Sequence, residues 1–130
     1  MPFDQSSTAD VELIIVTDDR AHAESVRNSL SRYQYAITHI AQRATLLTDF
    51  DAAVEAVRGK RPVIVFLDYA FLRGQAETLA ARVLELRRAM AIECVATRPP
   101  AEHSRRMRLR MLGASLFDDQ TRTAEAILLN

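Results

Sequence analysis

A short apolar run, residues 62–68, ends abruptly on a carboxylate and constrains the fold more than any other stretch. Every residue from Val63 to Leu67 is β-branched, aliphatic or aromatic, which is typical of a strand covered on both faces in a parallel sheet. Pro62 fits because it stands at the strand's first position, where a missing N–H costs least. Asp68, as the last residue, would then point into the crevice at the carboxyl edge of the sheet, where open α/β sheets bind their ligands.

A second apolar run ends in the same way. Residues 11–17 read as a strand, and Asp18 and Asp19 follow it directly. Because the carboxyl ends of parallel strands lie at one edge, three carboxylates are predicted to meet there.

Length and composition narrow the class of protein. The chain has 130 residues, which fits one domain with a real core. Its 17 basic and 17 acidic residues balance, so bulk charge gives no reason to expect direct binding to nucleic acid or to an anionic membrane. Cys94 lies in an apolar run and is predicted to be a reduced core residue. No apolar run reaches the length of a membrane span and no signal-peptide pattern opens the chain, so we expect a cytoplasmic protein without a membrane partner.

Strand and helix patterns alternate along the chain. Residues 1–9 are polar and unpatterned and predict a flexible tail, so the domain is expected to span 10–130. Strands are predicted at 11–17, 35–40, 62–68, 92–97 and 114–117, and a loop at 69–74. Helices are predicted at 21–32, from about 48 or 49 to 58, at 75–90, at about 99–112 and at 123–130. This alternation predicts an α/β fold: a doubly wound five-stranded parallel sheet with helices on both faces and a short last helix.

The chain resembles the receiver domains of two-component response regulators over nearly its whole length. The resemblance rests on the order and spacing of five landmarks: Asp18-Asp19, Asp68, Thr97, Gly113-Ala114 and Phe117. It implies a flavodoxin-like sheet with strand order 2-1-3-4-5. It also implies signalling through protein–protein contacts in a bacterial phosphorelay, with an output protein or domain as a further partner.

The resemblance implies a role for each landmark. Asp68 would accept a phosphoryl group from a sensor histidine kinase or a phosphotransfer protein. Thr97 would hydrogen-bond the phosphoryl oxygens, and Phe117 would rotate inward on activation. Such a receiver catalyses at most its own phosphoryl transfer and dephosphorylation, so no enzyme activity on other substrates is expected.

The resemblance also implies a weak Mg²⁺ site. Its ligands would be Asp18, Asp19, Asp68 and the backbone carbonyl of Ala70. Mg²⁺ prefers oxygen ligands and is typically held by one or two carboxylates with waters and phosphate oxygens. Without the ion, mutual repulsion should make one of the clustered carboxylates hold its proton more tightly.

The chain departs from the family at a position that matters for charge. Gln120-Thr121 stands where family members have a lysine followed by proline, so the usual ammonium is missing. We predict that Arg98, or as second choice Arg20, supplies the cation, lies across Asp68 and lowers its pKa. The alternative is that Arg98 points into solvent and the site is electrostatically incomplete.

Other functions stay open beside the phosphorylated receiver. One alternative is a phosphorylation-independent pseudo-receiver that acts as a docking or dimerisation module, which the missing lysine favours. A small α/β enzyme acting on phosphate esters through Asp68 is disfavoured, because Ala70 stands where it would need a second carboxylate. The face formed by residues 101–130 is a candidate homodimer or acidic-partner contact.

Two further groups of residues could carry a function: a cluster of arginines and three histidines. The arginines of the 99–112 segment are either the solvated face of their helix or a docking patch; they are Arg105, Arg106, Arg108 and Arg110. The three histidines lack metal-ligand spacing and are expected to be structural or exposed; they are His22, His39 and His103.

Overall fold

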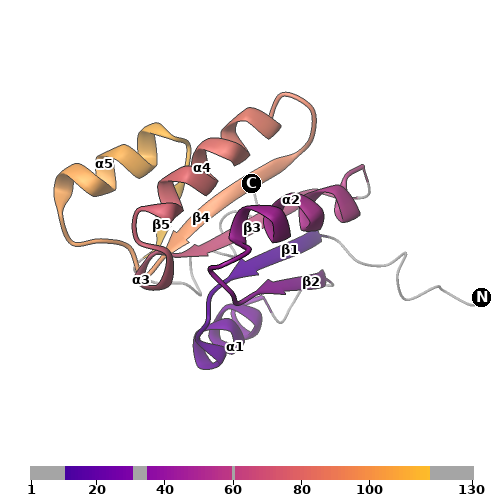
Figure 1. Ribbon diagram of the computed structural model, residues 1–130, viewed down its shortest axis with the longest axis horizontal. Coiled ribbons are helices and arrows are strands. Elements are labelled where there is room, and N and C mark those ends of the chain that lie inside the picture. The colour runs from indigo at the N-terminus through magenta and orange to yellow at the C-terminus, as the bar shows by residue number, and fades with distance from the viewer. Residues whose placement is uncertain (1–10, 31–34, 60, 118–130) are drawn as a thin grey trace, which may run out of the picture.

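The computed structural model describes residues 11–30, 35–59 and 61–117, which form an α/β fold around one parallel sheet (Figure 1). The strands are β1 (Val11–Val16), β2 (Tyr35–Ile40), β3 (Val63–Asp68), β4 (Ile92–Thr97) and β5 (Ser115–Phe117). The helices are α1 (Arg20–Asn28), α2 (Leu46–Val57), α3 (Tyr69–Leu72), α4 (Gln75–Leu86) and α5 (His103–Met111). The strand order is β2-β1-β3-β4-β5, so the predicted fold class and order are confirmed. The predicted tail at 1–9, Gln120 and the predicted last helix at 123–130 lie outside the described residues.

Strand register brings the predicted polar residues to one edge. Asp68 pairs with Thr97 across β3 and β4, and Thr97 pairs with Phe117 across β4 and β5. Val16, the last residue of β1, pairs with Leu67, so the β1–α1 loop begins beside Asp68.

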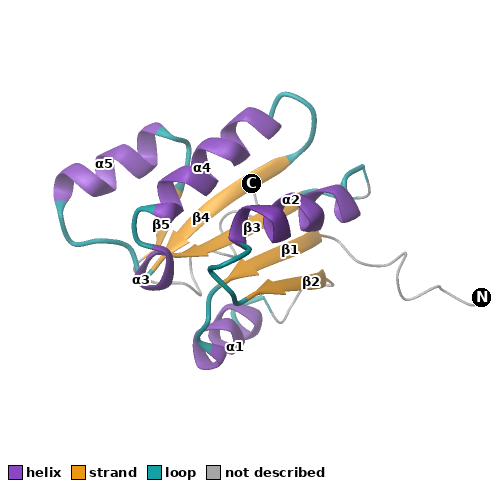
Figure 2. Cartoon of the chain, in the orientation of Figure 1, coloured by secondary structure: helices purple, strands orange, loops and turns teal. Residues whose placement is uncertain are grey.

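The sheet divides the core into two layers (Figure 2). On one face, side chains such as Ile14, Val65 and Ala96 pack in one cluster with buried residues of α2, α3 and α4. On the other face, residues such as Leu13 and Phe66 pack with Val26 of α1 and with Phe117. The central strands β1 and β3 are buried along their whole length, because helices cover both of their faces. No helix of the described part of the chain is long and apolar enough to cross a membrane.

Several helix bounds differ from the prediction. Residues 69–72, predicted as loop, form the short helix α3, because the Asp68 carboxylate accepts a hydrogen bond from the N–H of Ala70 and caps it. The helix predicted to begin at Pro99 begins at His103, because the backbone of its N-cap, Glu102, is extended. The proline at 100 also disfavours a helical conformation at residue 99. α4 ends at Leu86 rather than 90. Bonds from Arg88 to Glu85 and from Ala89 to Leu86 tighten its last turn.

The two remaining helices are displaced at one end. α1 ends at Asn28, four residues earlier than predicted, where the Ser29 hydroxyl donates to the carbonyl of Val26. α2 begins at Leu46, two or three residues earlier than predicted. Leu46 is buried in the core, so tertiary packing extends this helix past the expected capping residues.

Candidate functional site

Asp68 occupies the carboxyl end of the central strand β3 and is almost completely buried, with 1% of its surface exposed. Its Oδ2 accepts a hydrogen bond of 2.6 Å from the hydroxyl of Thr17, and its Oδ1 accepts one of 3.1 Å from the N–H of Ala70. Burial of a carboxylate is costly unless it is paired and hydrogen-bonded. Asp68 therefore needs a cation nearby.

Arg98 supplies that cation. Its Nε donates to Asp68 Oδ1 at 2.9 Å, and its Nη2 donates to Asp68 Oδ2, so the guanidinium forms a two-pronged contact with the carboxylate. The third nitrogen, Nη1, donates to Oδ2 of Asp19 at 3.1 Å. The predicted placement of Arg98 across Asp68 is thus observed. Arg20, the second choice, is exposed and forms no ion pair with the residues that the structure describes.

The backbone of Arg98 is in an unusual conformation. Its φ is 46°, in the left-handed region that residues other than glycine rarely adopt. Such conformations cost of order 1–3 kcal/mol and persist where the surroundings enforce them. The contacts of the guanidinium with Asp68 and Asp19 are the described interactions that hold Arg98 in this position.

The two aspartates that follow β1 have different surroundings. Asp19 is half-buried and caps α1, because its Oδ1 accepts a hydrogen bond of 3.1 Å from the N–H of His22. The Asp19 N–H donates in turn to Oγ1 of Thr17. Asp18 is exposed. Of these two aspartates, only Asp19 is therefore linked to Asp68 by described contacts, through Arg98.

The residues proposed for Mg²⁺ do not fit the ion in this arrangement. Arg98 holds both oxygens of Asp68 and one of Asp19. Among the described residues, no three acidic, histidine or cysteine side chains are grouped so that they could hold a metal ion. Binding through Asp68 would require the guanidinium to leave, so the magnesium site stays a prediction that this conformation does not favour.

The electrostatics of the site differ from the expected carboxylate repulsion. Burial alone would raise the pKa of Asp68. Hydrogen bonds from Arg98 and Thr17 outweigh it and hold that pKa below its ordinary value. The pKa of Asp19 is also lowered, first by the hydrogen bond from the N–H of His22. Neither Asp68 nor Asp19 therefore holds its proton more tightly, as had been expected of one clustered carboxylate, because a guanidinium lies between the two.

Thr97 has a partner that the sequence did not indicate. Nε2 of His22 lies 2.7 Å from Oγ1 of Thr97, in a buried hydrogen bond. Burial lowers the pKa of His22, which favours the neutral ring. The structural role foreseen for the histidines holds for His22, yet its closeness to the site was missed. One signal was available: His22 lies one turn after the acidic pair and next to Ala23 in the buried stripe of α1.

Thr17 is the second site residue that sequence reasoning missed. It is fully buried directly after β1, and its hydroxyl both donates to Asp68 and accepts from Asp19. A polar residue between an apolar strand and an acidic pair was the available signal. Phe117, the predicted switch aromatic, is buried in the core layer that contains Phe66.

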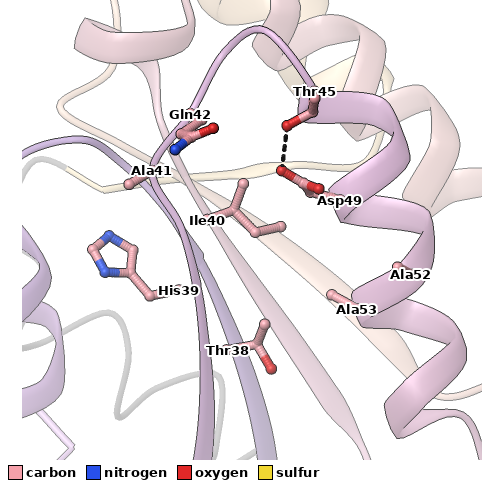
Figure 3. Close-up of a pocket in the computed structure, with 9 residues that line it drawn as sticks. All are labelled: Thr38, His39, Ile40, Ala41, Gln42, Thr45, Asp49, Ala52 and Ala53. Atoms are coloured by element: carbon pink, nitrogen blue, oxygen red, sulfur yellow. Dashed lines mark hydrogen bonds between the residues drawn. The ribbon is translucent and has the colours of Figure 1, made fainter.

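A separate open groove of about 610 Å³ lies between β2 and α2 (Figure 3). His39 and Asp49 stand on opposite sides of it with Ile40 between them. Asp49 accepts a hydrogen bond of 2.7 Å from the hydroxyl of Thr45, and His39 contacts the carbonyl of Thr17. These polar groups do not converge on a common point, so the groove is not a catalytic site. The Asp68 cluster is the better candidate.

Comparison with known proteins shows likeness at the level of the fold. No family model and no curated protein matches the chain. The signal receiver domain of the DNA binding response regulator protein merR from Colwellia psychrerythraea 34H superposes with a TM-score of 0.69 and 18% identity, over 93% of this chain and 100% of that one. A response regulator from Thermotoga maritima gives 0.63 and 15%, over 93% and 99%. A putative pilus assembly protein, cpaE, from Burkholderia thailandensis E264 gives 0.62 and 13%, over 92% and 99%.

Proposed function

Proceeding from its receiver fold, we propose that this chain is an atypical receiver of a bacterial two-component pathway that signals through protein–protein contacts without phosphorylation of Asp68. The observation that carries the proposal is the contact of Arg98 with both oxygens of Asp68. A phosphoacceptor must present a carboxylate oxygen to the incoming phosphorus. Here both oxygens already accept hydrogen bonds, and the carboxylate is buried.

The surroundings of Asp68 support the same conclusion. The hydroxyl of Thr97, which would bind phosphoryl oxygens in a phosphorylated receiver, is paired with His22. The arrangement also does not fit Mg²⁺, and phosphoryl transfer depends mainly on positioning and charge neutralisation. One fold neighbour is described as a putative pilus assembly protein rather than as a response regulator, so the fold is also found in a protein described in other terms.

The second candidate is a receiver that accepts a phosphoryl group on Asp68 from a histidine kinase or phosphotransfer protein. One observation favours it: Arg98 places a positive charge directly beside the acceptor, and guanidinium binds phosphate as readily as carboxylate. In this case Arg98 would turn from the carboxylate to the phosphoryl oxygens. The site would then hold the cation that Gln120 cannot provide.

Labelling with acetyl phosphate in the presence of Mg²⁺ separates the two candidates. We expect the intact mass of the protein to stay unchanged, because Asp68 has no free oxygen to attack the donor. A response regulator receiver with a complete site, labelled in the same buffer, is the positive control. A mass increase of one phosphoryl group that Asp68→Asn abolishes would replace the proposal by the second candidate.

We further propose that α5 carries the docking surface for an acidic partner. Three of its four arginines are engaged within the chain: Arg105 with the hydroxyl of Tyr69, Arg106 with the carbonyl of Pro100, and Arg108 with Glu77. Arg110 forms no ion pair with the described residues, and it is exposed on the same helix as the exposed side chains of Met107 and Met111. Because α5 contains no acidic residue, two copies of it would repel each other, which favours an acidic partner over a symmetric homodimer.

A peptide containing glutamate and leucine tests this surface. We expect it to shift the amide NMR signals of residues 103–111, with an affinity that falls as salt is added. Arg110→Glu should weaken binding, whereas Arg88→Glu, the same change at an exposed site after α4, should not. Shifts outside α5, or equal effects of the two variants, would contradict the proposal.

A further inference from the structure

One guanidinium joins the ends of three strands at the carboxyl edge of the sheet. Arg98 follows β4, Asp68 ends β3, and Asp19 lies in the loop that follows β1. The distances of 2.9 Å to Asp68 and 3.1 Å to Asp19 are those of charge-assisted hydrogen bonds. The guanidinium therefore has the position and the carboxylate partners that a bound cation would have at this edge.

The contact of Arg98 with the two carboxylates differs from an ordinary surface ion pair. Surface ion pairs commonly contribute little, but Asp68 is 1% exposed and cannot exchange its partner for water. The positive φ of Arg98 shows that the chain tolerates backbone strain at this position while the guanidinium bridges the two carboxylates.

We infer that Arg98 is a built-in cation that takes the place of a divalent metal ion in this chain. The inference goes beyond the proposed function, because a module that signals without phosphorylation could equally keep an open metal site. It explains why acidic residues gather at this edge of the sheet although their arrangement does not fit Mg²⁺. It also predicts that the parent protein does not need a metal ion at this site. Variants without the guanidinium should gain the ability to bind one there.

Arg98→Gly is the most informative variant for testing whether the guanidinium excludes a metal ion. It removes the guanidinium, and glycine adopts a positive φ without strain, so the loop can keep its path. Arg98→Ala is the second variant. The matched control is Arg20→Ala, which removes an exposed arginine at the first position of α1.

The probe is Mn²⁺, which serves as a paramagnetic analogue of Mg²⁺. Binding is followed by the unfolding temperature and by broadening of the amide NMR signals of residues 17–19 and 68–70. We expect no Asp68-dependent effect in the parent or in Arg20→Ala. In Arg98→Gly, we expect a rise of several degrees in the unfolding temperature at saturating metal and broadening confined to these segments. Adding Asp68→Asn should abolish both effects.

Three results would overturn the inference. One is metal-dependent stabilisation of the parent that Asp68→Asn removes. Another is the absence of any gain in both Arg98→Gly and Arg98→Ala, and the last is an equal gain in Arg20→Ala. None of these readouts involves phosphorylation, so the inference and the proposed function can fail separately.

Discussion

Replacing Arg98 by alanine is expected to lower the free energy of unfolding by about 2–3 kcal/mol at pH 7. The loss follows because Asp68 would remain buried with only Thr17 and the N–H of Ala70 as partners. Breaking a buried ion pair typically costs roughly 3–5 kcal/mol, and we take a smaller value of about 2–3 kcal/mol because the Arg98 side chain is 38% exposed. Urea unfolding of the parent and of Arg98→Ala measures the difference.

The loss should depend on pH, with a sign set by Asp68. In the parent, Arg98 and Thr17 hold the pKa of Asp68 below its ordinary value of about 3.9, so the stability it contributes is present above that pH and is lost as pH falls through the folded-state pKa. In Arg98→Ala, burial still raises this pKa while the main opposing hydrogen bonds are gone. The difference between the two proteins should therefore be complete above the folded-state pKa of Asp68 in the variant, and it should shrink as pH is lowered toward the depressed folded-state pKa of Asp68 in the parent.

Two further variants separate charge from backbone strain. Arg98→Gly should be about 1 kcal/mol more stable than Arg98→Ala, because only alanine pays for the left-handed conformation. In a double-mutant cycle, Asp68→Asn should cancel much of the loss in Arg98→Ala, since no buried charge is left unpaired. Arg20→Ala should change stability by less than about 0.5 kcal/mol. A loss that is the same at pH 7 and at low pH, or that persists in the Asp68→Asn background, would show that the ion pair is not its cause.

The second large effect is expected at Leu109, the one buried side chain of α5. Leu109→Ala should lower the free energy of unfolding by about 2–4 kcal/mol, as is usual when a fully buried leucine is truncated. The remaining residues of α5 are exposed or partly exposed, so the helix has no second buried anchor. In Figure 1, α5 lies beside α4 and is the outermost helix on that side of the sheet.

Hydrogen exchange should show where this stability is lost. We expect amides of residues 103–111 to lose protection first, because a helix held by one buried side chain opens locally before the sheet unfolds. Met111→Ala is the matched control: its side chain is 78% exposed and the change should be nearly neutral. Leu109→Ala should also weaken binding of the acidic peptide while leaving the Arg98 contact with Asp68 intact. Equal effects of the two variants would mean that α5 is held by other contacts.

The α/β architecture and the position of the site could be predicted from the sequence because both follow from local patterns. The apolar strand 63–67 and the acidic residues directly after two strands indicate a parallel sheet with a polar carboxyl edge, whatever the details of packing. The strand order came from the family resemblance, and the observed sheet has that order. The position of Arg98, directly after the predicted strand 92–97, also indicated an arginine at this edge of the sheet.

Helix ends and hydrogen-bond partners required the tertiary structure. Asp18 and Asp19 are adjacent and chemically equal, yet only Asp19 caps α1 and meets Arg98, because the turn between β1 and α1 sets their directions. The pairing of His22 with Thr97 joins residues 75 positions apart, which no local pattern records.

The state of Asp68 was decided in the same way. Whether three carboxylates repel each other, hold a metal or share an arginine depends on where one side chain of the β4–α5 loop lies. The sequence left Arg98 two choices, solvent or Asp68. Burial of Asp68 decided between them, because a carboxylate removed from water needs a cation within hydrogen-bonding distance.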